Sequence, residues 1–553
     1  MFRTNNRNQE PLLLSDVSEL PERSQQRLKE SWAGTFREEV FGRIEEERFA
    51  VLYSEKASRP NYPVNILLGL EILKDGRGWT DEEMYEHFCY DLQVRYALGC
   101  DRFREDEFEL RTLYNFRHRL AEYTMKTGED LLKGLFEQIT DEQMAKLGLK
   151  TDKQRYDSTM LLSNIADLSR LELLIVVIQR LWRVVRKEDQ SRWEELFGPY
   201  VKESAGQYSY RLKGREVVWA HIAQVGQALY KILEEMRTDY KQDAIYEVAQ
   251  RFFEENFVIE QSISQAKDNR EIQPGCLQSV DDLEATYRVK GNHAYKGYVA
   301  NLAETCHPDN PVQLFDDLQV APNQVSDIQM LLEGVPDLQE RTGMDTVVTD
   351  GAYVSPAVDA TLRTLGIEQI PTALTGTLPD HRDGRLALSD FDFQQNVQGE
   401  VTGVTCPTGQ SAQVQAVASG KSYRLIFDPA VCRDCPFFCT DRCPVEPNKD
   451  LSRFSLYLPK DRANSAQRRR HFEQHKQEAR NLRTAVEAGV FQFKHNWIHG
   501  KLRVRGLIRV SATCVFSLLH VNLRRIDRYR HGKLRDKRSM EARKAAKMAA
   551  TPA

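Results

Sequence analysis

The chain has 553 residues, of which 41% are hydrophobic and 29% charged, a composition that excludes wholesale disorder and predicts about three or four domains. No apolar run reaches the roughly 18 residues that a membrane span needs, and the N-terminus lacks the apolar segment of a signal peptide, so we expect a soluble, intracellular protein. The net charge of −4 hides an asymmetry, because residues 461–553 carry 23 Lys and Arg against 7 Asp and Glu, and residues 1–460 carry 54 against 74. So basic an end favours a polyanionic partner such as nucleic acid over a solubilising tail.

Residues 1–145 are predicted to be helical. One helix ends in the glycine-rich turn 75–78, and the next begins with a capping-box pattern from Thr80 to Glu83. A third, amphipathic helix is predicted over 109–123. Its basic side chains are Arg111, Arg117, His118 and Arg119. Short helices with tight turns and a basic final helix are typical of a helix-turn-helix DNA reader, although many three-helix bundles share the pattern.

Predicted strands and helices follow. Residues 148–163 are typical of a strand, and 165–275 of a helical insertion. Two alternating segments then flank the turn Gly291-Asn292, which predicts a hairpin. After a loop and a helix come a buried strand over 344–350, a helix with Ser355 as N-cap, Pro356 at its first position and Gly366 past its end, and an extended segment. This order predicts an α/β sheet of mixed direction with one large insertion.

The last third of the chain is predicted to begin with a second insertion. Its residues are rich in Gly, Thr, Pro and Asp, which predicts short strands, and one long charged helix is expected over 464–496, then an apolar helix over 504–523 and a frayed tail. The expected domains are 1–145, 146–375 with its helical insertion, 376–455 as a β-rich insertion, 456–527 and a basic tail over 528–553.

Two aspartates stand at strand positions suited to a metal. Asp157 lies within the first predicted strand, and Asp350 ends the strand over 344–350, directly before Gly351. The carboxyl ends of strands are where ligands bind in open α/β sheets, and carboxylate oxygens suit Mg²⁺. Asp152 is the main rival to Asp157, but its odd offset places it on the opposite face of a regular strand.

A third acid is indicated on the charged helix. Arg483, Glu487 and Lys494 follow the spacing i, i+4, i+11, and at 100° per residue all three share one helical face. On that face a glutamate is able to hold a metal while its basic neighbours contact phosphates. Surface ion pairing is the simpler interpretation of the same spacing. Glu473 and Glu478 are rivals that lack the Arg and Lys spacing.

These motifs together resemble the DDE transposases of bacterial insertion sequences, in particular the group that is IS-eleven-eighty-two-like, with an N-terminal domain of the InsH type. The resemblance rests on YDST around Asp157, TDGAY around Asp350, and an R-x3-E-x6-K pattern at Glu487, although Arg480 replaces a tyrosine of the family signature. It implies an α/β ribonuclease H-like catalytic core, with an N-terminal helical domain, a helical insertion and a small β-rich cysteine-containing insertion. It also implies a DDE triad of Asp157, Asp350 and Glu487 that binds Mg²⁺ or Mn²⁺.

The activity implied by this resemblance is metal-dependent strand cleavage at transposon ends, followed by strand transfer into target DNA. We expect Arg483 and Lys494 to contact DNA phosphates. The expected partners are transposon-end DNA and target DNA, bound by a homodimer in the bacterial cytoplasm, at the nucleoid, with no membrane. The alternatives are a catalytically inactive DNA-binding regulator derived from a transposase, and another ribonuclease H-like nuclease.

Two further features of the C-terminal part carry predictions. Cys432, Cys435, Cys439 and Cys443 form a compact run that predicts a structural Zn²⁺ site, with Cys406 as a possible replacement for one ligand. Residues 501–547 carry 15 Lys and Arg, and we expect Arg503 and Arg505 to bind DNA in a manner that weakens with salt.

Overall fold

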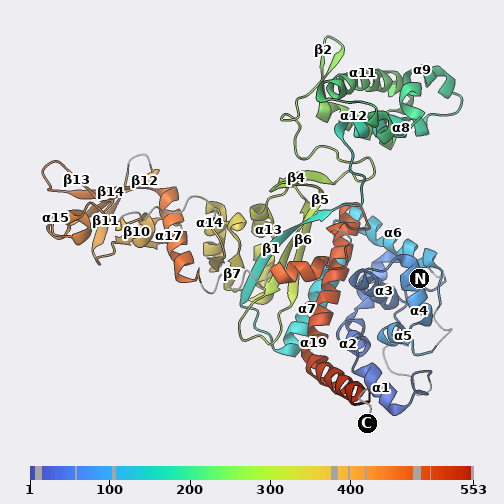
Figure 1. The fold of residues 1–553 in the computed structure, drawn as a ribbon, viewed down its shortest axis with the longest axis horizontal. Coiled ribbons are helices and arrows are strands. Elements are labelled where there is room, and N and C mark those ends of the chain that lie inside the picture. Colours follow the sequence, from blue (N-terminus) through green and yellow to red (C-terminus); the bar gives the residue numbers. More distant parts are fainter. Residues whose placement is uncertain are drawn as a thin grey trace.

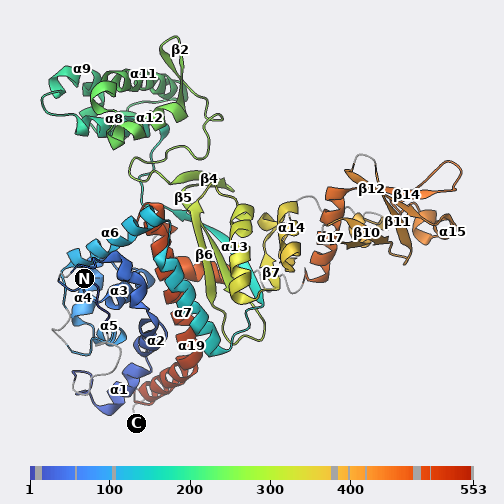
Figure 2. The same cartoon turned by 180° about the vertical axis from the view of Figure 1, so that it is seen from behind.

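The computed structural model shows a central sheet with three groups of elements around it (Figure 1). The N-terminal helices and the C-terminal helix α19 flank one side, a helical lobe stands apart at one end, and a β-rich lobe stands apart at another; the view from behind agrees (Figure 2). The structure describes residues 1–5, 15–56, 59–102, 107–374, 384–396, 399–417, 420–476, 487–497 and 500–549, with side chains described to residue 532.

The N-terminal part is helical, as predicted. Its helices are α1 (Glu22–Lys29), α2 (Trp32–Glu39), α3 (Val64–Arg77), α4 (Asp81–Tyr90), α5 (Leu92–Ala97), α6 (Leu110–Thr127) and α7 (Leu131–Leu147). The capping box at α4 is confirmed, since Glu83 N–H donates to Thr80 Oγ1 and Thr80 N–H donates to Glu83 Oε2. Apolar residues continue at helical spacing from α4 to Tyr96, but they belong to two helices. Asp91 ends α4, and its carboxylate accepts hydrogen bonds from the first N–H groups of α5.

The central sheet has mixed direction, as predicted. Its strands are β1 (Lys153–Leu162), β4 (Thr286–Lys290), β5 (His293–Thr305), β6 (Phe315–Pro322), β7 (Thr346–Thr349) and β8 (Glu368–Pro371). β5 pairs with β1, β4 and β6 in antiparallel fashion, with β4 and β6 following one another along its outer side. β7 is parallel to β1, and β8 is parallel to β7. Residues 315–322, which the sequence analysis left outside any strand, are therefore part of the sheet.

Two helices cover the face of this sheet that carries Tyr156. α13 (Asp327–Thr342) and α14 (Pro356–Leu365) share a buried apolar cluster with that side chain. The predicted boundaries of α14 are confirmed, because Ser355 Oγ accepts from Val358 N–H and Gly366 adopts the left-handed conformation that ends the helix. The opposite sheet face, which carries Asp157, packs toward the C-terminal helices.

The helical lobe is inserted between β1 and β4. It comprises α8 (Arg170–Val184), α9 (Gln190–Val201), α10 (Ala205–Tyr210), α11 (Arg215–Tyr240), α12 (Ala244–Asn256), β2 (Phe257–Glu260) and β3 (Ile263–Ala266). Its apolar side chains form their own core, including Trp193, Phe197 and Phe252. The prediction of helix up to residue 275 is wrong at its end, because 257–266 form the β2–β3 hairpin.

The β-rich lobe follows β8. It contains β9 (Asp392–Gln395), β10 (Val401–Thr405), β11 (Ser411–Ala416), β12 (Ser422–Phe427), β13 (Glu446–Pro447), β14 (Phe454–Pro459), α15 (Pro429–Cys432) and α16 (Pro436–Cys439). The predicted short strands are confirmed, and they form one six-stranded sheet. The single long charged helix predicted over 464–496 is not confirmed. α17 (Lys460–Gln474) ends at the cap residue His475, and a further helical stretch covers 487–494.

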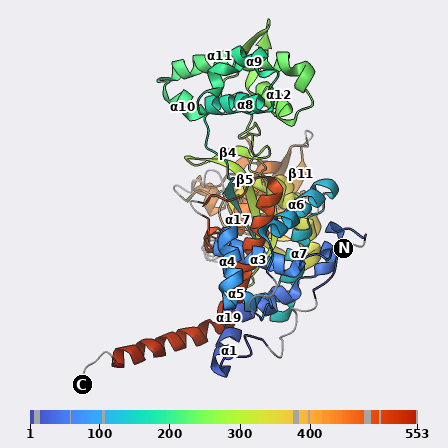
Figure 3. The ribbon, with the colours of Figure 1, turned by 90° about the vertical axis from the view of Figure 1, so that its right-hand side faces the viewer.

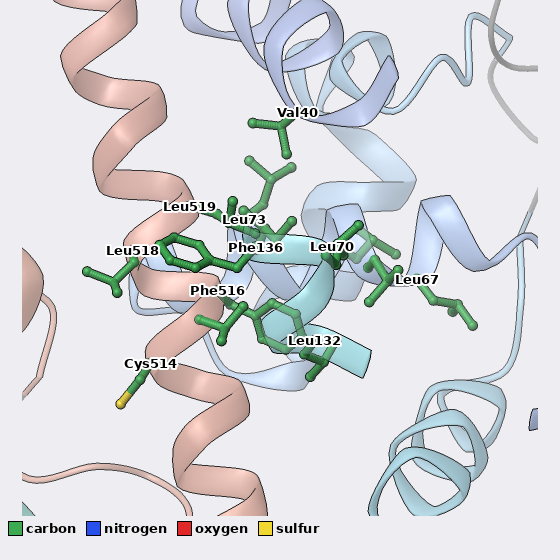
Figure 4. Close-up of a cluster of buried hydrophobic side chains, with 14 of the residues drawn as sticks. Val40, Leu67, Leu70, Leu73, Leu132, Phe136, Cys514, Phe516, Leu518 and Leu519 are labelled. Carbon is green, nitrogen blue, oxygen red and sulfur yellow. The ribbon is translucent and has the colours of Figure 1, made fainter. Parts of the chain in front are cut away.

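The final helix, α19 (Leu507–Ala549), is longer than predicted. It continues through the basic segment that was expected to fray, and its last turns extend away from the body of the protein (Figure 3). Its first half packs between the sheet and the N-terminal helices. There Leu518 and Leu519 of α19 lie in one buried cluster with Leu73 of α3 and Phe136 of α7 (Figure 4). The two ends of the chain thus build one core.

Candidate functional site

Asp157 and Asp350 lie side by side on neighbouring strands of the central sheet. β1 and β7 pair in parallel with Lys153 opposite Thr346 and Arg155 opposite Val348. This register, continued by two residues, places Asp157 opposite Asp350, which directly follows the last residue of β7. The structure therefore brings these two predicted residues together, where β7 ends beside the middle of β1, and the carboxyl end of such a strand is where α/β sheets bind ligands.

The two carboxylates lie in a partly desolvated position. Burial, and next the negative charge of Asp350, raise the pKa of Asp157 to about 7, while the ammonium group of Lys290 acts in the opposite direction. Two nearby carboxylates disfavour each other's ionised form, and a cation that both contact removes that repulsion. The oxygen donors suit a hard divalent cation such as Mg²⁺.

The turn after β7 fixes Asp350. Its carboxylate accepts a hydrogen bond from Ala352 N–H at 2.8 Å. One residue on, Tyr353 is fully buried, and its hydroxyl donates to Asn301 Oδ1 of β5 at 2.6 Å. This hydrogen bond ties the turn to the middle of the sheet. Tyr353 and Asn301 were not singled out from the sequence, where only the TDGAY motif pointed to that turn.

Residues 487–494 form a helix against the sheet face that carries Asp157. The ammonium group of Lys494 donates to Thr159 Oγ1 at 3.2 Å and to the carbonyl of Met160 at 2.8 Å. Thr159 and Asp157 are two residues apart on β1 and share one face. A side chain at Gly489 would lie 3.1 Å from Glu304 Oε2 of β5, so this helix approaches the sheet closely.

Glu487 is exposed, in the first described turn of this helix. It precedes Lys494 by seven residues, and at 100° per residue the two lie on the same helical face. The hydrogen bonds described above hold the Lys494 side chain against β1. For Glu487 they establish only which helix carries it and which face of that helix it shares with Lys494. Arg483, like the rival acid Glu478, lies outside the described residues.

The other rival acids lie elsewhere. The carbonyl of Asp152 accepts N–H groups from Asp345 and Thr346 at the start of the parallel strands. At about 3.3 Å per residue, that end is roughly 16 Å from Asp157. Glu473 is exposed on α17, where it pairs with Lys476 at 3.2 Å.

Arg503 and Arg505 lie away from the aspartate pair. Both line a cavity of about 550 Å³ between the N-terminal helices and the start of α19, and Arg505 is 3.6 Å from Asp281. Arg117 of α6, part of the basic face expected to read DNA, also lines this cavity. It is already paired with Asp81 at 2.6 Å and with Glu71, so its charge is neutralised within the N-terminal region.

The cysteine run is only partly gathered. Cys432 is buried, Cys406 and Cys443 are partly buried against the core of the β-rich lobe, and Cys435 is half-buried. Cys439, in contrast, is exposed, and its thiol donates to the carbonyl of Arg433.

Family comparisons match two segments of this chain. Residues 26–119 match a transposase domain of the DUF772 type, and residues 405–527 match a transposase DDE domain. The chain belongs to the insertion-sequence DDE transposases. Glu487 and Lys494 fall within the second match, whereas Asp157 and Asp350 fall outside both. No curated protein and no solved structure matches this transposase. Among its described helices, none has the length and apolarity required to cross a membrane.

Proposed function

We propose that this transposase cleaves DNA strands at transposon ends and joins the freed ends to target DNA, using Asp157, Asp350 and Glu487 as a metal-binding triad. The observation that carries the proposal is the juxtaposition of Asp157, in the middle of β1, with Asp350, directly after the parallel strand β7. A protein that only binds DNA gains nothing from holding two carboxylates together in a partly desolvated position, since each raises the cost of ionising the other.

The residues fit divalent metal ions. Asp157 and Asp350 would provide oxygen donors from adjacent strands, and Glu487, exposed on the helix that packs on the same sheet face, would provide the third. When bound, a pair of Mg²⁺ or Mn²⁺ ions supplies activation of the attacking oxygen and charge neutralisation at the leaving oxygen of a phosphodiester. The hydrogen bond from Ala352 N–H orients the Asp350 carboxylate before any ion binds.

Two lysines flank the aspartates with positive charge. Lys494 is held on β1 by Thr159 and Met160, and Lys290 stands exposed at the end of β4, near enough to oppose the pKa shift of Asp157. We assign both to DNA phosphates, contacts that position a strand without reading its sequence. Lys290 was not identified from the sequence, because a lysine at a hairpin tip is ordinarily a surface residue.

The sheet supports a ribonuclease H-like core. β1, β5 and β6 form an antiparallel unit, α13 then leads to β7 beside β1, and α14 leads to β8 beside β7. We propose that transposon-end DNA lies along the part of the sheet that carries the aspartates, and that Arg503 contacts DNA nearer the N-terminal helices. Joining two ends requires two active sites, so we propose a homodimer on DNA.

The test is strand cleavage by the purified full-length chain. A duplex containing the DNA that flanks its own gene is incubated with Mg²⁺ or Mn²⁺, and the wild type runs beside Asp350→Asn and Asp152→Asn. Asparagine at 350 keeps an oxygen that accepts from Ala352 N–H, so the fold is retained while the metal-binding charge is lost. We expect metal-dependent nicks at one defined junction, abolished in Asp350→Asn and retained in Asp152→Asn, with DNA binding intact in both.

Two results would contradict the proposal. Cleavage by Asp350→Asn at the wild-type rate would remove the aspartate from the mechanism. Salt-sensitive binding without cleavage, on single ends and on a synapsed two-end substrate alike, would favour the inactive DNA-binding regulator.

A further inference from the structure

The turn between β10 and β11 has a fixed shape and carries a cysteine. Cys406 N–H donates to the carbonyl of Gln410 at 2.9 Å, and Gly409 N–H donates to the carbonyl of Cys406 at 2.9 Å. Gly409 has φ of +88°, a conformation that glycine adopts readily and other residues rarely do. The turn therefore holds Cys406 in a defined place, where the neighbouring strands β10 and β11 of the six-stranded sheet are connected.

A single side chain connects this turn to the cysteine-rich helices. Gln410 Oε1 accepts from the thiol of Cys432 at 3.3 Å, and Gln410 Nε2 donates to the carbonyl of Asp428 at 3.3 Å. Asp428 is the N-cap of α15, the short helix that ends at Cys432. Residues far apart in sequence, 406–410 and 428–432, are thus held side by side.

Four of the five thiols in this lobe gather at one place: Cys406 and Cys443 pack against the apolar cluster that contains Cys432, and Cys435 N–H donates to the carbonyl of Cys432 at 3.3 Å. Burial, and then the nearby thiols of Cys443, Cys435 and Cys406, raise the pKa of Cys432 to about 12. Burial also raises the pKa of Cys443, with Cys435 and Cys406 contributing in the same direction.

We propose that Cys406, Cys432, Cys435 and Cys443 bind one Zn²⁺ as four thiolates, and that Cys439 is not a ligand. Four cysteine sulfurs are a donor set that closes a tetrahedral zinc site. The C-x2-C pair 432/435 spans the start of α16, and Cys406 and Cys443 approach it from the turn and from the segment after α16. This assignment replaces the consecutive run 432, 435, 439 and 443, because the thiol of Cys439 is exposed and directed to the carbonyl of Arg433.

The proposed ion would stabilise a lobe with a small core. Its buried apolar residues come from short strands, and the segment from Arg433 to Val445 contains only α16 as regular structure. Four metal–sulfur bonds would join this segment to the β10–β11 turn. In such small units the metal-binding free energy contributes directly to folding.

A second group in the chain is the rival location for a metal. Three side chains, Glu368, His471 and His475, already have ligand atoms within 4.8 Å of one another, and they are the only such group among the described residues. Zinc binding by the four thiols therefore requires them to close around the ion. Glu368 and His471 are already joined at 2.8 Å, which explains their proximity as an ion pair or hydrogen bond at the end of α17. We favour the thiols over Glu368, His471 and His475 as the zinc site, because sulfur is a softer donor and the thiols are better shielded from solvent.

The first experiment maps cysteine reactivity in the wild-type, full-length protein. The chain is loaded with Zn²⁺, alkylated, digested and analysed by mass spectrometry, and a second sample is stripped with a chelator first. We expect Cys406, Cys432, Cys435 and Cys443 to be protected by zinc and modified after chelation, and Cys439 to be modified in both samples. Protection of Cys439 with labelling of Cys406 would overturn the ligand set.

The second experiment measures bound metal in three variants. Cys406→Ser is expected to lose the stoichiometric zinc that the wild type retains, whereas the matched control Cys439→Ser keeps it, as does His471→Ala. With Co²⁺ in place of zinc, the wild type and Cys439→Ser should give the same intense thiolate-to-metal absorption. Loss of zinc from His471→Ala alone would place the metal at α17, and absence of zinc from loaded wild type would refute the site. Neither readout depends on DNA cleavage, so this proposal fails or stands apart from the proposed function.

Discussion

The N-terminal helices and the inserted helical lobe bury their apolar side chains in different ways. In the N-terminal region, α3 and α7 share a core with α19, which begins only at Leu507, near the other end of the chain (Figure 4). Polar contacts follow the same route, since Thr35 Oγ1 donates to Asp527 at 2.8 Å and Arg530 pairs with the buried Glu39. In the lobe, α8 to α12 pack on each other and on the β2–β3 hairpin.

The difference indicates which parts move together. Because they share one buried core, we expect the N-terminal helices, α19 and the sheet to unfold as one cooperative body. The lobe is joined to that body through the segments at both of its ends, and it is free to unfold or shift on its own. Regions with few contacts to the rest of a protein are those that open independently.

The largest expected effect is on isolated fragments. A fragment of residues 166–281 should fold, with helical circular dichroism and one cooperative thermal transition. A fragment of residues 1–148 should lack a cooperative transition, because without α19 the apolar faces of α3 and α7 are exposed to water. Adding a peptide of residues 505–532 to the second fragment should restore part of its structure. A cooperative transition in the 1–148 fragment alone would refute the shared core.

Asp282 is the buried point where the lobe, the sheet and α19 meet. Its carboxylate accepts hydrogen bonds from Ser163 at the end of β1, from Tyr298 of β5, and from Gly506 N–H at 3.1 Å, just before α19. Asp282→Ala leaves these donors without an acceptor and should lower the free energy of unfolding by about 3 kcal/mol. Hydrogen exchange should rise at 163–165 and 506–510 but not within α11. Faster exchange throughout α11 would show that the lobe depends on the sheet for its stability.

Much of this fold follows from local sequence rules. Ser355 and Gly366 delimit α14, the Gly291-Asn292 turn marks the β4–β5 hairpin, and strand position together with the YDST and TDGAY motifs singled out Asp157 and Asp350, which the structure places side by side. These features depend on residues close together in the chain, where capping, turn chemistry and alternation act directly.

What the sequence analysis missed depends on distant residues. β6 begins Phe-Asp-Asp, a polar start that resembles a loop until Lys133 of α7 and Arg341 of α13 are seen to approach its aspartates. The sequence analysis named Cys406 only as an alternative ligand, and our proposed choice of Cys406 over Cys439 depends on the β10–β11 turn, which lies 26 residues before Cys432 in the chain. Tertiary contacts of this kind leave no local periodicity to detect.

Two glycines at close helix contacts permit a matched test of the comparison. A Cβ at Gly76 of α3 would lie 2.0 Å from the imidazole of the buried His520 in α19, and one at Gly226 of α11 would lie 2.2 Å from the Phe257 ring. Each Gly→Ala change gains helix propensity but forces a shift, with a net loss of about 1–2 kcal/mol. By hydrogen exchange, Gly76→Ala should loosen α19 and β1, whereas Gly226→Ala should loosen only the lobe. Additive losses in the double variant would confirm two independent units.

The smallest effect expected concerns the seam between β6 and α7. Asp316 lies fully buried at a β-bulge, and burial, opposed by the charge of Arg341, raises its pKa from 3.8 to about 7. Its folded pKa exceeds its unfolded pKa, so the folded state binds more protons between those values, and this residue's contribution to stability falls as pH rises from about 4 to 7. Asp316→Asn removes that loss, and should raise the free energy of unfolding by about 1–2 kcal/mol at pH 8 with little change at pH 4.

The neighbouring Asp317 pairs with Lys133 of α7 at 3.4 Å, so Asp317→Asn should instead destabilise the protein at pH 8. Urea unfolding of the three proteins at both pH values provides the comparison. Because the fragment 166–281 lacks this seam, its stability should show none of the Asp316 dependence, and equal pH profiles for Asp316→Asn and wild type would show that Asp316 does not titrate in this range.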